Sequence, residues 1–448
     1  MVATIIVDFQ YCFIFILLCF SSLLCYTLFF RKPKDSCVDF PLPPSPPSLP
    51  IIGHLYLLLS VLIHRSLQKL SSKYGSILYL RIFGFPIVLV SSASVAYEIF
   101  RAHDVNISSR GFPPTDDSLF AGSFSIISAP YGDYWKFMKK VLVTNLLGPQ
   151  ALERSRRVRG DELDRFYNNL FDKAAKKESV EICEEALKLT ISSICKLIMG
   201  RCCLEEGGVV ERVKGLANEL NELLQKVLVE YEEKQGEHHL QGMDLMDVLL
   251  EAYRDEKAEY KITRNHIKSF YAWTLAEIIN SPNTLKRLRG ELDSVVGTVR
   301  LIQETDLPNL PYLQAVVKEG LRLHPPGPLF GRFSQEGCKV GGFYVPEKTS
   351  LMINDYAVMR DPDYWVDPDE FKPESGRRSC PGENLAFIFI GTAIGVMVQG
   401  FEWKFKEDKV NMEETVVGLS LTMAHPLKRT PVARTFNSLT LNLKSCGL

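Results

Sequence analysis

A cysteine flanked by glycines, placed directly before a long apolar segment, is the feature of this sequence that most constrains its fold. Residues 373–385 read P-E-S-G-R-R-S-C-P-G-E-N-L, and the cysteine is Cys380. Gly376 and Gly382 permit backbone angles and close approaches that a side chain would forbid, so a tight loop can present the sulfur to a flat ligand. Residues 385–398 are almost wholly apolar, which predicts a buried helix.

The surroundings of Cys380 favour an anionic sulfur. Arg377, Arg378 and the N-terminus of the following helix all stabilise a thiolate relative to a thiol. An uncompensated charge carried into the protein interior would be very costly, and a trivalent iron would neutralise it. Cys380 is therefore the candidate metal ligand. The alternative is an ordinary buried or surface thiol, which is what a lone cysteine beside a basic pair usually is.

Composition excludes some classes of protein. The chain has 448 residues, enough for two or three average domains or for one large helical fold. Lysine and arginine number 52 against 53 acidic residues, so no net charge favours a nucleic-acid partner. The eleven cysteines show no paired spacing typical of a disulfide scaffold or a zinc site, which fits a reducing, cytosolic environment.

The N-terminal region has the character of a membrane anchor. Residues 11–30 carry no charge and are long enough to cross a bilayer as one helix. Asp8 precedes this segment and three basic residues follow it within residues 31–34, which places the rest of the chain in the cytosol. A cleaved signal peptide is the alternative, but the basic start is absent and the apolar run is too long. Residues 41–50 are proline-rich and predict a stiff spacer.

The remaining pattern is mostly helical. Residues 77–82 and 86–91 are β-branched and apolar and predict a hairpin. Together with long helical segments, this predicts a mainly α protein with small, segregated β-sheets. Further helices are predicted over residues 67–74, 134–147, 262–281 and 312–324, and a further strand over residues 350–357.

Two pairs of side chains stand at helical spacing. Trp135 and Lys139 are four residues apart on one face, so an indole N–H and an ammonium group can bind one carboxylate. The alternative is an amphipathic helix with a core tryptophan and a solvated lysine. Glu319 and Arg322 are three apart and can form an ion pair, but surface pairs of this kind are common and contribute little.

Four features in this order resemble the plant microsomal cytochromes P-450. They are the basic and proline-rich stretch after the apolar segment, P-Y-L-Q-A-V-V-K-E-G-L-R-L-H-P-P-G-P at residues 311–328, D-P-D-E-F-K-P-E at residues 367–374, and G-R-R-S-C-P-G at residues 376–382. The resemblance implies the cytochrome P-450 fold and a heme b (iron protoporphyrin IX) ligated by Cys380. Gly376, Arg378 and Gly382 would belong to the heme-binding loop.

The resemblance also implies roles for residues outside this loop. Trp135 and Lys139 match the pair that holds one heme propionate, and Arg332 matches the residue that reaches the other. Glu319 and Arg322 match the E-x-x-R pair, which joins a later arginine to brace the heme loop.

The activity implied by the resemblance is a heme-dependent monooxygenase. It would insert one oxygen atom from O2 into a small apolar plant metabolite, with electrons from NADPH supplied by a membrane-bound flavoprotein reductase. Residues 1–30 would anchor the chain in the lipid bilayer of the endoplasmic reticulum, residues 31–52 would form the hinge, and residues 53–448 would form a shortened cytosolic catalytic domain.

The sequence departs from the family at catalytic positions. The A/G-G-x-D/E-T motif of the central helix is absent, and neither Thr274 nor Glu277 replaces it, so no residue is assigned a catalytic role. The chain also looks shortened after Gly208, between Tyr271 and Ala272, and between Glu374 and Ser375.

The last departure touches the heme loop directly. The bracing arginine is replaced by Ser375, and Pro373 stands where a phenylalanine would pack against the loop. The alternative function is a non-catalytic remnant, or a mis-spliced form, that binds heme weakly or not at all. The substrate and its site of oxidation stay open.

Overall fold

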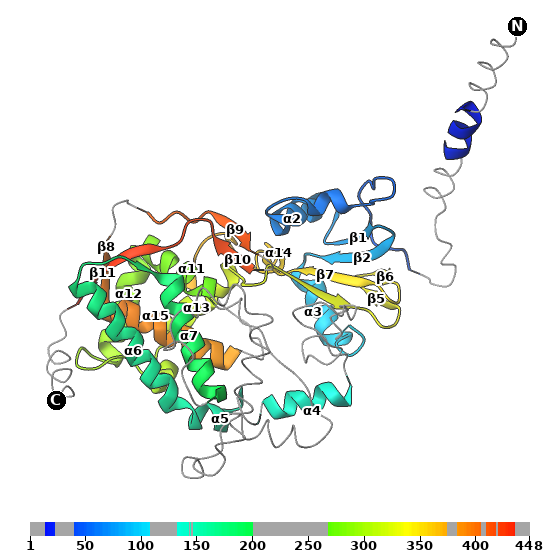
Figure 1. Ribbon diagram of the computed structural model, residues 1–448. Helices are drawn as coiled ribbons and strands as arrows, with labels where there is room; N and C mark the ends of the chain where they lie inside the picture. Colours follow the sequence, from blue (N-terminus) through cyan, green and yellow to red (C-terminus); the bar gives the residue numbers. More distant parts are fainter. Residues whose placement is uncertain are drawn as a thin grey trace, which may run out of the picture. The chain divides into compact units, whose positions relative to one another are not determined.

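The computed structural model describes residues 14–22, 40–107, 132–142, 144, 147–199, 268–373, 383–404, 409–417 and 420–434. It divides into two compact units (Figure 1). The first comprises Met1–Ile107 with Arg332–Ile353, and the second comprises Ser108–Gly331 with Asn354–Leu448.

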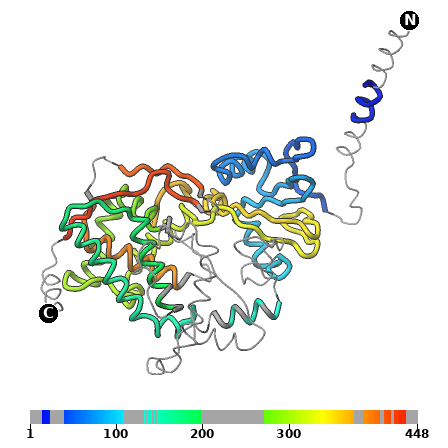
Figure 2. Tube along the Cα trace, in the orientation of Figure 1, coloured from blue at the N-terminus to red at the C-terminus, as the bar shows by residue number. Residues whose placement is uncertain are grey.

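The first unit brings together segments that are far apart in the sequence, as the blue and yellow parts of the trace show (Figure 2). Its elements are η1 (Leu55–Leu58), α2 (Ile63–Tyr74), β1 (Ile77–Ile82), β2 (Phe85–Val90), α3 (Ala93–Ala102), β5 (Cys338–Val340), β6 (Phe343–Val345) and β7 (Ser350–Asn354). β4 (Leu329–Phe333) enters this unit at Arg332.

The predicted hairpin is present. β1 and β2 pair antiparallel and close at Ile82 and Phe85 around a two-residue turn. Phe83 and Gly84 have positive φ angles of 49° and 86°, as a turn of type I′ requires. β2 then pairs parallel with β7, which gives the sheet order β1-β2-β7-β4. Val88, Leu89 and Val90 are fully buried, so this strand is covered on both faces.

The second unit is mainly helical. Its helices are α4 (Asp133–Leu142), α5 (Pro149–Arg154), α6 (Arg156–Ala175), α7 (Ile182–Met199), α11 (Lys268–Asn280), α12 (Pro282–Val295), η3 (Glu304–Asn309), α13 (Pro311–Leu323), α14 (Asp355–Val358) and α15 (Glu383–Gly400). Its strands are β3 (Val180–Glu181), β8 (Phe401–Lys404), β9 (Glu414–Val417), β10 (Ser420–Met423) and β11 (Lys428–Ala433), in the sheets β3-β11-β8 and β10-β9.

The helix that follows the cysteine loop forms the core of this unit. α15, drawn in orange in Figure 1, packs against α6, α11, α12 and α13. Its last three turns are buried, including Ile394, Met397 and Val398 at 0% exposure. The prediction of a buried apolar helix in this position is therefore confirmed, and so is the mainly α class with small, separate sheets.

One element differs from its prediction. The strand predicted over residues 350–357 ends at Asn354, and a short helix follows. The Asn354 side chain accepts a hydrogen bond from the backbone N–H of Ala357 at 3.2 Å, which caps that helix. The mostly apolar run continues past the cap at Asn354, so a prediction from hydropathy alone made the strand too long.

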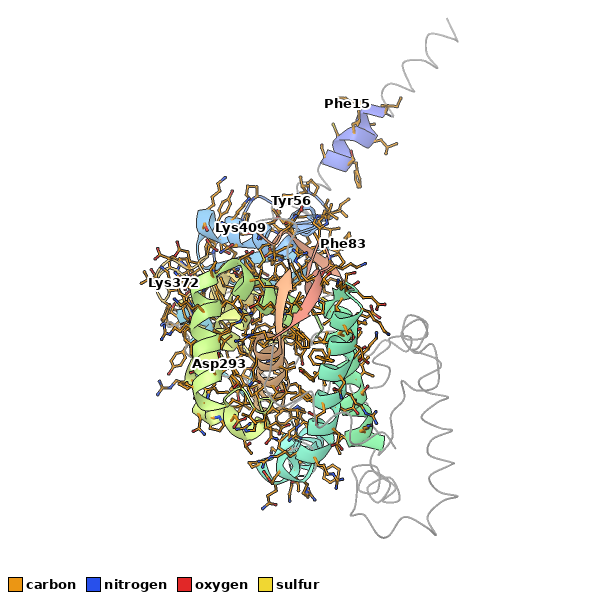
Figure 3. All side chains as sticks on the ribbon, turned by 90° about the vertical axis from the view of Figure 1, so that its left-hand side faces the viewer. Phe15, Tyr56, Phe83, Asp293, Lys372 and Lys409 are labelled. Atoms are coloured by element: carbon orange, nitrogen blue, oxygen red, sulfur yellow. The ribbon has the colours of Figure 1, made fainter. Side chains whose placement is uncertain are left out.

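Only part of the expected membrane segment lies among the described residues. Residues 14–22 form a helix on which Phe15 is 67% exposed (Figure 3). In the part of the chain that the structure describes, no helix is both long and apolar enough to span a membrane.

Candidate functional site

Glu319 and Arg322 form a buried ion pair on α13 of the second unit. Both carboxylate oxygens of Glu319 accept a hydrogen bond from the guanidinium of Arg322, each at 2.9 Å. Glu319 is 0% exposed and Arg322 is 5% exposed. The pair is therefore not the exposed helix-surface contact that its spacing alone suggested, and breaking it would leave a buried charge without compensation.

Arg322 also holds a segment distant in sequence. Its Nη1 donates to the carbonyl oxygens of Met359 at 2.9 Å and Pro368 at 2.7 Å, and its Nη2 donates to that of Glu370 at 3.0 Å. Glu319 Oε1 in turn accepts the backbone N–H of Lys372 at 2.8 Å. Backbone groups of residues 359–372 are therefore hydrogen-bonded to both members of the pair.

This arrangement holds a segment that precedes the cysteine motif in the sequence. Residues 359–372 end eight positions before Cys380 in the sequence. The Trp365 ring lies 4.9 Å from the Arg322 guanidinium carbon, which adds an aromatic contact to the backbone hydrogen bonds. Cys380, Gly376, Arg378 and Gly382 lie outside the described residues, so their assignment to the heme-binding loop stays a prediction.

Trp135 and Lys139 lie together on α4. The Lys139 Nζ atom is 4.9 Å from the centroid of the Trp135 ring. Trp135 is partly buried and Lys139 is exposed. Their role as propionate ligands stays a prediction.

Arg332 lies in the first unit, on β4. Its guanidinium carbon is 5.9 Å from the centroid of the Phe100 ring of α3. The side chain is partly buried, and its role as a second propionate ligand also stays a prediction.

A hydrogen bond between His324 and Glu277 of α11 was not predicted from the sequence. His324, directly after α13, makes a 2.8 Å hydrogen bond through Nε2 to Glu277 Oε1. Its ring stacks on that of Trp273 at a centroid distance of 4.2 Å and an interplanar angle of 5°. The spacing of Trp273 and Glu277 by four residues could have shown that they share a helix face, but nothing local pointed to the histidine.

Glu277 and Thr274, to which the sequence assigns no catalytic role, differ in their surroundings. Glu277 is engaged with His324. Thr274 is 0% exposed, and its hydroxyl has no hydrogen-bond partner among the described residues. Just before them, Tyr271 is also fully buried, and burial raises the pKa of its phenol. The start of α11 therefore fills the core with bulky side chains.

Burial perturbs two ionisable groups at the two ends of α14. It raises the pKa of Asp355, at the start of α14, from 3.8 to about 6. It also lowers the pKa of Arg360, which follows α14. In both cases burial disfavours the charged form.

Comparison with known proteins places this geometry in a family. A family model described as "Cytochrome P450" matches residues 43–231 and 206–428. Cytochrome P450 705A20 of Arabidopsis thaliana is 59% identical over 498 residues, covering 96% of this chain and 97% of the relative. Because this span exceeds the 448 residues of the chain, the relative contains residues without a counterpart here.

More distant proteins agree. The 3,9-dihydroxypterocarpan 6A-monooxygenase of Glycine max is 32% identical and covers 94% of this chain and 98% of the relative. A solved zebra fish cytochrome P450, whose title names abiraterone, has a TM-score of 0.72 at 22% identity and covers 84% of this chain and 100% of that chain. These matches, with the buried Glu319–Arg322 pair on α13, show that the chain belongs to the cytochrome P450 family.

Proposed function

We propose that this chain is a heme-thiolate monooxygenase that inserts one oxygen atom from O2 into a small apolar plant metabolite. The observation that carries the proposal is the buried Glu319–Arg322 pair, whose hydrogen bonds hold residues 359–372, which end eight positions before Cys380 in the sequence. The cofactor of the family is heme b, which receives electrons from NADPH through a reductase.

The chemistry of the expected donors suits such a cofactor. Heme b carries two carboxylates, and the donors at the expected positions are an indole N–H, an ammonium and a guanidinium, on Trp135, Lys139 and Arg332. Cys380 would supply the thiolate, which favours O–O cleavage when heme is bound. Glu319 and Arg322 would hold the chain that leads to this thiolate, and the protein would contribute position and electrostatics.

The substrate class rests on the relatives. One of them is named as a monooxygenase of a dihydroxypterocarpan, a small ring compound, and the relatives with the highest identities reported above are plant proteins. We infer a substrate of similar size and low polarity for this chain.

We also propose that the chain is anchored in the endoplasmic reticulum membrane, with residues 1–30 as the anchor, residues 31–52 as the hinge and residues 53–448 in the cytosol. Exposed apolar side chains support a lipid-facing surface on the first unit. Ile51 is 77% exposed, Phe83 57% and Phe85 74%. A β-bridge between Gly53 and Ile82 brings these side chains to the same end of the unit. Figure 3 labels Phe83 on this unit.

Membrane attachment can be tested by fractionation of cells that express the full chain. We expect the protein to stay in the membrane pellet after extraction at alkaline pH, and to move to the supernatant when residues 1–30 are removed. Full extraction of the intact chain would contradict the anchor.

A second function, a non-catalytic remnant, has specific support. The family's oxygen-activating motif is absent, and Thr274, the only serine or threonine of α11 after Ser269, is fully buried, and its hydroxyl has no hydrogen-bond partner among the described residues. With no acid and alcohol to deliver protons, turnover would depend on water and would release reduced oxygen species.

The reduced protein exposed to carbon monoxide separates the two functions. A Soret band at the thiolate-ligated position, lost in Cys380→Ala, is the result expected of a monooxygenase. A folded chain that takes up no heme would establish the remnant. Product formation with a flavoprotein reductase and NADPH then tests turnover. Cys183→Ala is the matched control because Cys183 is a partly buried cysteine of α7 in the same unit.

A further inference from the structure

A second buried arginine lies beside the Glu319–Arg322 pair. Arg360 follows α14 and is 6% exposed. Its Nη2 donates to the carbonyl oxygen of Leu323 at 2.6 Å, and its guanidinium carbon lies 3.7 Å from the centroid of the Tyr356 ring. Its Nε also donates to Asp369 Oδ1 at 3.0 Å, but the Asp369 side chain is 83% exposed. The Leu323 carbonyl and the Tyr356 ring are buried contacts of Arg360, and the buried carboxylate of Glu414 also favours its charge.

The contacts of the two arginines are reciprocal. Arg322, at the end of α13, donates to the carbonyl of Met359, the residue before Arg360. Arg360 donates to the carbonyl of Leu323, the residue after Arg322. Each guanidinium thus holds the backbone beside the other, and the two together tie the end of α13 to the end of α14.

This arrangement is a costly way to gain stability. Burial lowers the pKa of Arg360, and the like charge of Arg322 adds to this effect, while the carboxylates of Glu414 and Asp369 oppose it. The Nη1 atom of Arg360 has no hydrogen-bond partner among the described residues. A buried charge of this kind is weak evidence for a stabilising role, because well-packed apolar residues often serve as well. A guanidinium, in contrast, fixes a carbonyl by direction as well as by distance.

We propose that Arg360 is a positioning residue, which forms with Arg322 a crossed clasp that fixes residues 359–372 and through them the orientation of the Cys380 thiolate. The clasp would take over the task left by the arginine that Ser375 replaces. The proposal rests on the proposed heme-thiolate function for its effect on the cofactor, but not for the clasp itself.

The cofactor effect is tested with Arg360→Gln and Arg360→Lys in the full-length protein. At equal heme content, we expect Arg360→Gln to lower the ratio of thiolate-ligated to otherwise ligated carbon monoxide complex about tenfold, the effect of losing one charge-assisted hydrogen bond. The ratio for Arg360→Lys should lie between those of the parent and of Arg360→Gln, because lysine keeps the charge but lacks the planar, directed donors of the guanidinium.

The matched control is Arg159→Gln. Arg159 is 3% exposed, donates to the carbonyl of Leu152 at 2.6 Å and to the carboxylate of Glu304, and so loses similar contacts elsewhere in the same unit. It should lower stability without changing the ligation ratio. An unchanged ratio in Arg360→Gln, or an equal change in Arg159→Gln, would overturn the positioning role.

The clasp is tested separately by unfolding the heme-free chain. Arg322→Gln, Arg360→Gln and the double variant form a mutant cycle. Each variant changes the unfolding equilibrium constant by a factor relative to the parent chain. We expect the factor for the double variant to be about ten times smaller than the product of the two single-variant factors. Independent effects would refute the clasp. Absence of heme uptake by the parent chain would refute the proposed function and would leave this cycle as the deciding measurement.

Discussion

The buried carboxylate of Glu319 permits a sharp test of the site. Glu319→Gln keeps the size of the side chain but removes the charge that faces Arg322. The parent carboxylate makes two hydrogen bonds of 2.9 Å to the guanidinium and one of 2.8 Å to the backbone of Lys372. All of these lie in a place where Glu319 has no exposure to water.

The expected loss follows from this geometry. Removing one partner of a buried pair costs roughly 3–5 kcal/mol, because the other charge stays buried without compensation. This corresponds to a shift of about two to four powers of ten in the unfolding equilibrium. We expect the loss in equilibrium unfolding by urea, measured by circular dichroism with the slope unchanged.

A pair with the same spacing provides the control. Lys136 and Asp133 are also three residues apart, at 3.4 Å, but their side chains are 55% and 102% exposed. Asp133→Asn should cost about 1 kcal/mol or less. If Glu319→Gln cost no more than Asp133→Asn, burial would not be what gives the Glu319–Arg322 pair its strength, and the reasoning would fail.

Three further variants test other parts of the structure. Burial raises the pKa of Asp355 to about 6 from 3.8, so the folded chain binds this proton more tightly than the unfolded chain and stability falls as pH rises between these values. Asp355→Asn should therefore be more stable than the parent by up to about 3 kcal/mol at pH 8 and equal to it near pH 4 in urea titrations. Thr274→Val removes a buried hydroxyl without a partner among the described residues and should leave stability unchanged or raise it by about 1 kcal/mol, whereas a change in the peroxide released per NADPH would restore a catalytic role for this residue. Gly53→Ala would place a Cβ atom 2.2 Å from the Arg81 carbonyl oxygen at a φ of 63° and should cost over about 2 kcal/mol, while Gly84→Ala, with φ 86° and open space, should cost about 1 kcal/mol in the same assay.

Much of the fold could be predicted because its signals are local. The hairpin of β1 and β2 followed from β-branched residues around Phe83 and Gly84, and α15 followed from an apolar run longer than any strand. The helix of Glu319 and Arg322 followed from its periodicity. The strand over residues 350–357 was too long because the cap at Asn354 depends on a side-chain hydrogen bond that hydropathy does not reveal.

The site was only partly predictable. The spacing placed Glu319 and Arg322 on one helix face. It did not predict that the pair is buried, and so it did not predict how strongly the pair stabilises the fold. The pairing of His324 with Glu277 joins residues 47 positions apart, and the hydrogen bonds of Arg322 reach 37 to 48 positions along the chain. Such contacts depend on the path of the chain.

The sequence by itself determined the family and the order of the main elements, because a glycine-flanked cysteine motif, an E-x-x-R helix and apolar periodicity are patterns of neighbouring residues. Only the tertiary structure decided what holds residues 359–372 where the bracing arginine is missing. Backbone carbonyls and one backbone N–H close around Glu319 and Arg322, and Arg360 reaches back to Leu323. Backbone groups are the same at every residue, so no sequence pattern identifies which of them will meet a buried charge.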